Sequence, residues 1–378
     1  MSNISNRWVI IFLILPHLSI YYFKLEQFRP VIFIWQSAVI LLALFLIYRQ
    51  INTFNILMTF YMVIVVLSAV VHGTLSFGVL YTIGVFLSFC IYISYAIKNF
   101  NEFITGLYYL LTSVAILNFL TMLSHGITIA SNGDYAYLLG GKNAISLTLL
   151  PTIPLIYLYS YTIYHRLKLF PLIVILICII STYLSESGTG IVVSLLTIIF
   201  ILFPKKLLPS FYTYLLAYFI TFFSIVIFRL QEILFGDFIV DVLHKDMTFT
   251  GRTYIWDLVL NALKNSWFLG LGRGNSFISN NFINLSETHN GVLEVLMFSG
   301  IMGCLLFSLI LLIVGKKLFL KRKHIFSKIL SFSIFTYLII GLTESVFYKI
   351  EFWILLIISY NIENIIKHAD DNKLTSKP

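Results

Sequence analysis

Residues 291–314 read GVLEVLMFSGIMGCLLFSLILLIV, and this stretch decides the fold class. It carries one charged residue, Glu294, and exceeds the roughly 20 residues that a helix needs to cross the hydrocarbon core of a bilayer. Similar runs recur along the chain, in which 59% of the 378 residues are hydrophobic and 11% are charged. A soluble protein of this length would need more charge to cover its surface, so the sequence predicts an integral membrane protein.

The apolar runs predict an all-α, polytopic protein with about twelve transmembrane helices in one membrane domain, residues 1–378. Alternating ten-residue patterns of the transmembrane β-barrel type are absent. The first run has no small-residue cleavage site, so it is expected to be a retained span rather than a signal peptide. The polar tail 370–378 is expected to be disordered. The predicted spans are 8–23, 31–48, 54–71, 75–97, 103–123, 143–164, 169–184, 188–203, 211–228, 291–314, 325–342 and 347–366.

The distribution of Lys and Arg predicts the orientation of the chain, because short cytoplasmic loops are enriched in them. With the N-terminus inside, 16 of the 25 basic residues fall in inner segments and four in short outer segments. The other five lie in one long extracytoplasmic loop, 229–290, and long loops cross largely regardless of charge. Both termini, including the tail 367–378, are therefore predicted to be cytoplasmic. The net charge of +9 is attributed to orientation, and no nucleic-acid partner is expected.

The long outer loop contains TYIWDLVLNALK at 253–264, which has apolar residues on one face at helical spacing. It predicts an amphipathic helix on the outer membrane face or on the bundle, capped by Thr250 or Thr253. Arg252 then lies at a helix N-terminus, where bound anions are favoured. The alternative is that Arg252 only reaches toward lipid headgroups.

The same loop continues with GLGRGN, in which Gly270, Gly272 and Gly274 alternate around Arg273. No strand precedes these glycines, so a dinucleotide-binding fingerprint is not supported. A tight turn that exposes backbone N–H groups and one guanidinium would suit phosphate oxygens. A plain flexible turn is the other interpretation.

The stretch SETHNG at 286–291 places a polar pair, His289 and Asn290, where the loop becomes an apolar helix. The helix dipole disfavours a charged imidazolium there, so His289 is expected to be neutral and able to accept a proton as a general base. Asn290 either binds a sugar hydroxyl or caps the helix, and Glu294 is expected to face inward. The alternative is that His289 is an interfacial polar residue without a catalytic role.

A further feature concerns the predicted outer surface. Glu344 and Lys349 flank the last outer turn and form either a local ion pair or part of a cavity wall.

No HExxH, DxD or HxH pattern occurs, so neither a metal nor another cofactor is expected.

Taken in order, these motifs resemble a known family. They are GGKN before a span, the Ser-rich turn SESGTG at 185–190, Gly251-Arg252 with Trp256, GLGRGN, and THNGVLEVLMFSGIMG. This order is similar to that of the O-antigen ligases and Wzy-type polysaccharide polymerases, over roughly residues 140–310. The most specific element is HN-x-x-L-E-x-x-x-x-x-G, which here is His289, Asn290, Leu293, Glu294 and Gly300. Many members have an arginine in the Ser-rich turn, which this chain lacks, so Lys142 is expected to supply that basic contact.

The resemblance implies a glycosyltransferase-C-like fold and glycosyl transfer from undecaprenyl pyrophosphate at the outer face of the bacterial plasma membrane. His289 is then the base that activates the acceptor hydroxyl, and Arg252 and Arg273 neutralise the pyrophosphate. The remaining predicted substrate contacts are Asn290, Glu294, Lys142, Asn143, Ser187 and Glu344.

Four functions remain open at this level. The leading one is a metal-independent, inverting polymerase of lipid-linked repeat units for a capsule, O-antigen or exopolysaccharide, acting with or without a chain-length regulator. A ligase would differ in handing the glycan to a lipid or protein acceptor. A lipid-linked oligosaccharide flippase and a non-catalytic scaffold are the alternatives from other classes. If the protein is a transferase, Arg252, Arg273 and His289 should converge on one outward cavity.

Overall fold

The computed structural model describes residues 4–124, 126–129, 135–204, 206–230, 251–282 and 285–375. In this part of the chain the fold is all-α apart from a short hairpin of β1 (Thr128–Ile129) and β2 (Tyr135–Ala136). The helices are α1 (Ile4–Ile14), α2 (Arg29–Leu46), α3 (Thr53–Val71), α4 (Phe77–Ala96), α5 (Phe100–Leu123), α6 (Lys142–Tyr164), α7 (Leu169–Leu184), α8 (Gly188–Leu202), α9 (Phe211–Phe222), α11 (Arg252–Leu263), α12 (Phe277–Asn281), α13 (Gly291–Leu320), α14 (Ile325–Ile340), α15 (Ile350–Tyr360) and α16 (Ile362–Thr375).

Each of the twelve predicted spans overlaps one of these helices. Six helical segments in the described residues are long and apolar enough to cross a membrane: Arg29–Gln50, α3, α4, α5, α6 and α13. The other six apolar helices are shorter, between 10 and 17 residues. The protein is therefore a multi-pass membrane protein, and the count of twelve spans stays a prediction.

Two predicted spans and the tail differ from expectation. The span 8–23 is interrupted after Ile14 by a 3₁₀ turn that contains Pro16, because proline lacks the N–H that a continuing helix requires. The span 347–366 is divided between α15 and α16 at Asn361. The tail expected to be disordered from residue 370 is helical as far as Thr375, and residues 376–378 lie outside the described part. Ile362, Ile365 and Ala369, one helical turn apart, are buried and dock the start of α16.

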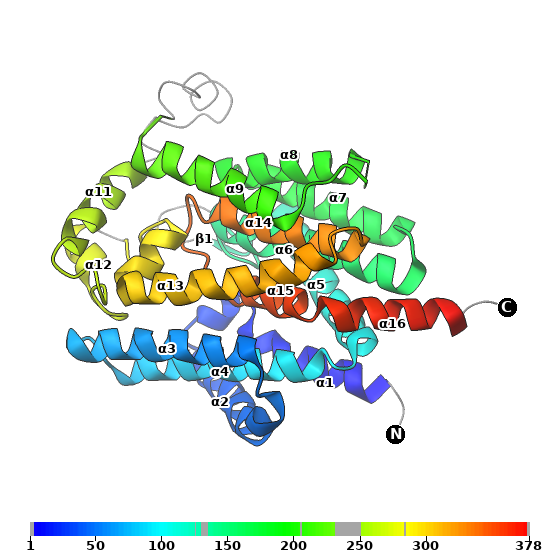
Figure 1. Cartoon of the computed structure of the whole chain (residues 1–378), viewed down its shortest axis with the longest axis horizontal. Coiled ribbons are helices and arrows are strands. Elements are labelled where there is room, and N and C mark those ends of the chain that lie inside the picture. Colours follow the sequence, from blue (N-terminus) through cyan, green and yellow to red (C-terminus); the bar gives the residue numbers. More distant parts are fainter. Residues whose placement is uncertain are drawn as a thin grey trace.

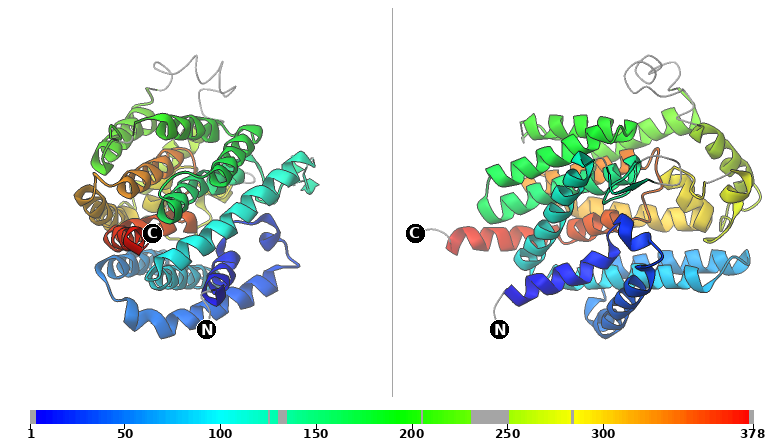
Figure 2. Two further views of the ribbon diagram at one scale, coloured as in Figure 1. Left: turned by 90° about the vertical axis from the view of Figure 1, so that its right-hand side faces the viewer. Right: turned by 180° about the vertical axis from the view of Figure 1, so that it is seen from behind.

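Several helices, among them α3, α4, α8, α9 and α13, run side by side along the length of the molecule (Figure 1), with α13 against α3, and α14 against α6 and α9. Residues 351–359 of α15 are all buried, and the end-on view places this C-terminal part near the middle of the bundle (Figure 2). Both termini lie at one end of the bundle, and α11 and α12 lie at the other (Figure 1). This arrangement fits an even number of spans, while the side of the membrane that each end faces remains a prediction.

Polar side chains act as N-caps of several helices. Asn52, Ser76, Ser187 and Asn290 each cap the helix that follows by accepting a backbone N–H from its first turn. Such caps replace partners that the first turn of a helix lacks, and they fix where the chain changes from loop to helix. For α8 and α13 the capping residues come from the two motifs that the sequence singled out.

The segment 229–290, predicted to be an extracytoplasmic loop, is described except for residues 231–250 and 283–284. The predicted amphipathic helix is α11, whose buried residues Ile255, Trp256, Val259 and Leu263 lie on the bundle beside α13. Its N-cap is Gly251, with φ of 80°, rather than a threonine; Thr250 lies outside the described residues and Thr253 is inside the helix. The short helix α12 was not predicted.

The GLGRGN turn is packed against a bend in α13 rather than flexible. Gly300 interrupts α13 with φ of 58° and ψ of −159°, so carbonyl groups before it lose their helical partners. Leu271 donates its N–H to Met297 O at 2.7 Å, and Ile301 donates to Trp267 O at 2.9 Å. The N–H groups of Gly270 and Leu271 are used within the protein, so these two are not available as donors to a phosphate.

Candidate active site

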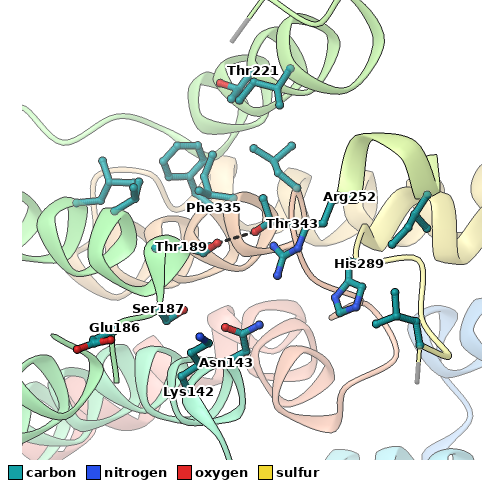
Figure 3. A pocket seen from close by; sticks show the side chains of 18 residues that line it. Lys142, Asn143, Glu186, Ser187, Thr189, Thr221, Arg252, His289, Phe335 and Thr343 are labelled. Atoms are coloured by element: carbon teal, nitrogen blue, oxygen red, sulfur yellow. Dashed lines mark hydrogen bonds between the residues drawn. The ribbon is translucent and has the colours of Figure 1, made fainter. Parts of the chain in front are cut away.

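A cavity of about 580 Å³ lies among α6, α8, α9, α11, α14 and the turns at their ends (Figure 3). It has a polar part and an apolar part. The polar lining residues are Lys142, Asn143, Glu186, Ser187, Thr189, Thr221, Arg252, His289 and Thr343. The apolar lining residues are Val192, Leu196, Ile225, Ile255, Leu285, Phe335, Ile339 and Leu342.

Some elements, such as α8 and α11, contribute to both parts of the cavity. Val192 and Leu196 of α8, Ile225 after α9, and Phe335 and Ile339 of α14 make an apolar wall. Figure 3 shows Phe335 on the opposite side of the cavity from the polar group at the start of α6 and of α8, with Arg252 and His289 at one end. A ligand that fills the cavity therefore meets hydrocarbon on one side and charge on the other.

His289 lies in a tight turn directly before Asn290, the N-cap of α13. Its backbone φ is 51°, a left-handed conformation that is uncommon for a residue with a side chain, and the imidazole is 23% exposed. The next residue, Asn290, is fully buried; its Oδ1 accepts from Val292 N and Leu293 N at 3.0 Å, and its Nδ2 donates to Leu342 O at 3.0 Å. Asn290 is thus a helix cap, and its side chain is not available to a sugar.

Glu294 also lies inside the protein rather than in the cavity lining. Its Oε2 accepts from Thr288 N at 3.0 Å, from Thr288 Oγ1 at 2.7 Å and from Ser345 Oγ at 3.1 Å. The expected inward orientation is found, but the expected substrate contact is not. Glu294 instead joins the turn before His289 to the turn after α14.

Glu344 joins the two cavity residues that carry the predicted chemistry. Its Oε1 accepts from an Arg252 amino group at 2.6 Å, and its Oε2 is 3.4 Å from His289 Nδ1. Burial of Glu344 raises the pKa of its carboxyl, but the hydrogen bond with His289 and the positive charge of Arg252 outweigh that effect and leave the pKa lowered. Glu344 is not paired with Lys349, whose ammonium is 3.9 Å from Glu287.

The second cation of the cavity is Lys142, the first residue of α6. The Ser-rich turn faces it (Figure 3), and there Ser187 caps α8 by accepting from Gly190 N at 3.3 Å. Lys142, Asn143 and Ser187, which were predicted to contact substrate, all line the cavity. Glu186, Thr189 and Thr343 were missed; Thr189 and Thr343 are bonded to each other at 2.6 Å. The two threonines gave a weak signal, because single threonines are common in membrane proteins, whereas Glu186 lies next to Ser187 in the Ser-rich turn.

Arg273 does not line the cavity. Its guanidinium lies over the rings of Tyr348 and Phe298, at 5.1 and 5.6 Å from the ring centres. Thr74 Oγ1 donates to its backbone carbonyl at 3.0 Å, which ties the turn to the end of α3. The expected convergence is therefore found for Arg252 and His289 and not for Arg273. Among the described residues no cluster of His, Cys, Asp or Glu has the arrangement of a metal site.

Comparison with known families matches residues 172–308 to the family model described as O-antigen ligase (Wzy_C). The match confirms the resemblance to the O-antigen ligase and Wzy-type family that the motifs indicated, and it covers α7 to the first part of α13. Lys142 and Glu344 lie outside the matched segment, so their place in the site rests on the tertiary structure. No curated protein and no solved structure matches the chain.

Proposed function

We propose that the protein is a metal-independent, inverting glycosyltransferase that polymerises oligosaccharide repeat units carried on undecaprenyl pyrophosphate, at the outer face of the bacterial plasma membrane. One observation carries the proposal: a single cavity joins an apolar wall to a polar floor that holds Lys142, Arg252 and His289. The resemblance of residues 172–308 to the O-antigen ligase family supports the same class of reaction.

The donor substrate has two chemically different parts, and the cavity has a counterpart for each. A polyprenyl chain is hydrocarbon and suits the wall between α8, α9 and α14. A pyrophosphate carries negative charge and suits Arg252 and Lys142 at the polar end. Arg252 gives one amino group to Glu344, and a guanidinium has five N–H donors, so it can hold a phosphate oxygen as well.

In the proposed reaction, an acceptor sugar hydroxyl attacks the anomeric carbon of the donor sugar. The hydroxyl proton passes to the free ring nitrogen of His289, Nε2, as the new C–O bond forms. The bond between the anomeric carbon and the pyrophosphate oxygen breaks, and undecaprenyl pyrophosphate leaves with the electron pair. Attack from the side opposite to the leaving group inverts the anomeric configuration. Arg252 and Lys142 stabilise the charge that develops on the leaving oxygen.

The proposal is tested by complementing a strain that lacks the gene with wild type, His289→Ala or His72→Ala, at matched membrane levels. His72, at the end of α3, does not line the cavity and serves as the matched histidine control. Wild type and His72→Ala should restore long surface chains on a polysaccharide gel. His289→Ala should lower polymer by about 10²-fold or more and leave single lipid-linked repeats.

Two outcomes would contradict this proposal. Full-length chains from His289→Ala would remove the base from the mechanism. Repeats that accumulate only at the cytoplasmic side in the absence of the protein would identify a flippase instead.

An O-antigen ligase is the second candidate, because the family that residues 172–308 match is that of the O-antigen ligases. Polymerase and ligase differ in the acceptor alone. Purified protein given only lipid-linked repeat units should form longer lipid-linked chains if it is a polymerase. A requirement for an added lipid or protein acceptor would assign it as a ligase.

A further inference from the structure

Two turns that are distant in sequence are held together behind the cavity. One is the turn at 286–290 before α13, and the other is the turn at 341–349 between α14 and α15. Gly291 N donates to Gly341 O at 2.7 Å, and Asn290 Nδ2 donates to Leu342 O at 3.0 Å. The buried carboxylate of Glu294 accepts from both turns, from Thr288 and from Ser345. The two turns therefore form one rigid unit.

This unit places Glu344 beside Arg252 and His289 rather than in contact with the cavity contents. The Glu344 side chain is 9% exposed and is not part of the cavity lining. Its two oxygens are divided between its partners: one is 2.6 Å from Arg252 and the other is 3.4 Å from His289 Nδ1. A carboxylate that accepts from Nδ1–H leaves Nε2 as the nitrogen without a proton.

We propose that Glu344 is a positioning residue that sets the orientation and tautomer of His289 and at the same time holds the guanidinium of Arg252 toward the pyrophosphate. The proposal rests on the glycosyl-transfer function proposed above and adds a fourth residue to Lys142, Arg252 and His289. Glu344 stays ionised throughout the reaction. It takes no proton from the acceptor; it stabilises the imidazolium that forms when Nε2 of His289 accepts that proton.

One carboxylate that serves both residues couples donor binding to base activation. Arg252 and His289 come from two different segments, and both contact the turn at 341–349 through Glu344. If either partner moves, the carboxylate loses half of its hydrogen bonding while it stays buried, which is costly. The geometry thus favours a site in which the phosphate-binding and the proton-accepting groups are correctly placed together.

The test uses the full-length protein in liposomes, with lipid-linked repeat units as donor and acceptor, and measures kcat and the donor KM. Glu344→Gln keeps the shape of the side chain but removes the charge, and Glu344→Asp keeps the charge on a shorter side chain. Glu344→Gln should lower kcat about 10- to 100-fold, as loss of an orienting partner does, and change KM by a smaller factor. Glu344→Asp should recover part of kcat. The control is Glu363→Gln, whose side chain pairs with Lys317 at the opposite end of α13 and should leave both constants unchanged.

A double-mutant comparison separates positioning from a structural role. If Glu344 acts through His289 and Arg252, adding Glu344→Gln to His289→Ala should lower the residual rate by a smaller factor than in wild type, because only the contact with Arg252 remains to be lost. The same factor in both backgrounds would overturn the proposal, and so would a raised KM with an unchanged kcat, which would indicate direct substrate binding. Thermal melting of each variant measures loss of folded protein. If wild type forms no polymer or transfer product at all, the proposed function fails rather than the role of Glu344.

Discussion

Residues 229–290 contain two Gly-Arg pairs that are alike in sequence, but the two arginines have different surroundings. Gly251 and Gly272 both have φ near 80°, and each is followed by an arginine. Arg252 lines the cavity and pairs with the carboxylate of Glu344, whereas Arg273 stacks on Tyr348 and Phe298 outside the cavity lining. A local motif therefore sets the backbone turn, and the packing around it decides whether the guanidinium meets a ligand or the protein.

The largest expected difference between the two pairs is in donor use. Arg252→Ala removes a cation from the cavity and leaves Glu344 buried without that partner. We expect donor turnover to fall by about 10²- to 10³-fold, as when one donor to a developing negative charge is removed. Arg252→Lys should recover only part, because a point charge replaces a planar fork. Turnover of lipid-linked repeats in liposomes measures both, and a fall of less than threefold for Arg252→Ala would exclude Arg252 as a pyrophosphate ligand.

The two glycines should differ in stability, although their backbone angles match. A Cβ on Gly272 would be 2.6 Å from Thr74 Oγ1 and 3.1 Å from Ala69 Cα, whereas a Cβ on Gly251 would meet no atom of the described residues within 4 Å. Gly272→Ala should therefore cost about 2–3 kcal/mol of unfolding free energy, from both backbone strain and crowding. Gly251→Ala should cost only the strain, about 1–2 kcal/mol. Thermal melting in one detergent compares them, and equal losses would mean that the packing of the GLGRGN turn against α3 contributes nothing.

The smallest expected effect is that of Arg273→Ala. A cation–π contact at a partly exposed site contributes about 0.5–1 kcal/mol, so the variant should melt slightly lower and keep its donor KM within about twofold. Arg273→Lys should retain part of the contact. A donor KM raised tenfold or more by Arg273→Ala would instead place Arg273 in the substrate site, as the family resemblance alone implied.

Other parts of the site show which features can be predicted from neighbouring residues in the sequence. The polar-to-apolar border at residues 286–291 predicted the helix start, and Asn290 caps it there. The Ser-rich turn predicted an outer connection, and Ser187 caps α8 in it. These features depend on neighbours within four residues, so the sequence is sufficient to identify them. Asn290 and Glu294 were expected to touch substrate because they are polar and close to His289, but their atoms are used by neighbouring turns.

By itself, the sequence determined the class of the protein, the approximate positions of its apolar helices and the place of His289 at the border of one of them. These properties are local, because membrane insertion sums hydropathy over about 20 consecutive residues. Only the tertiary structure decided that Lys142 and Arg252 share a cavity with His289, that Arg273 does not, and that Glu344 joins Arg252 and His289. Arg252 and Glu344 are 92 positions apart, and His289 and Glu344 are 55 apart. Their contact exists because the turns around α11, α13 and α14 pack together, and no local pattern encodes that packing.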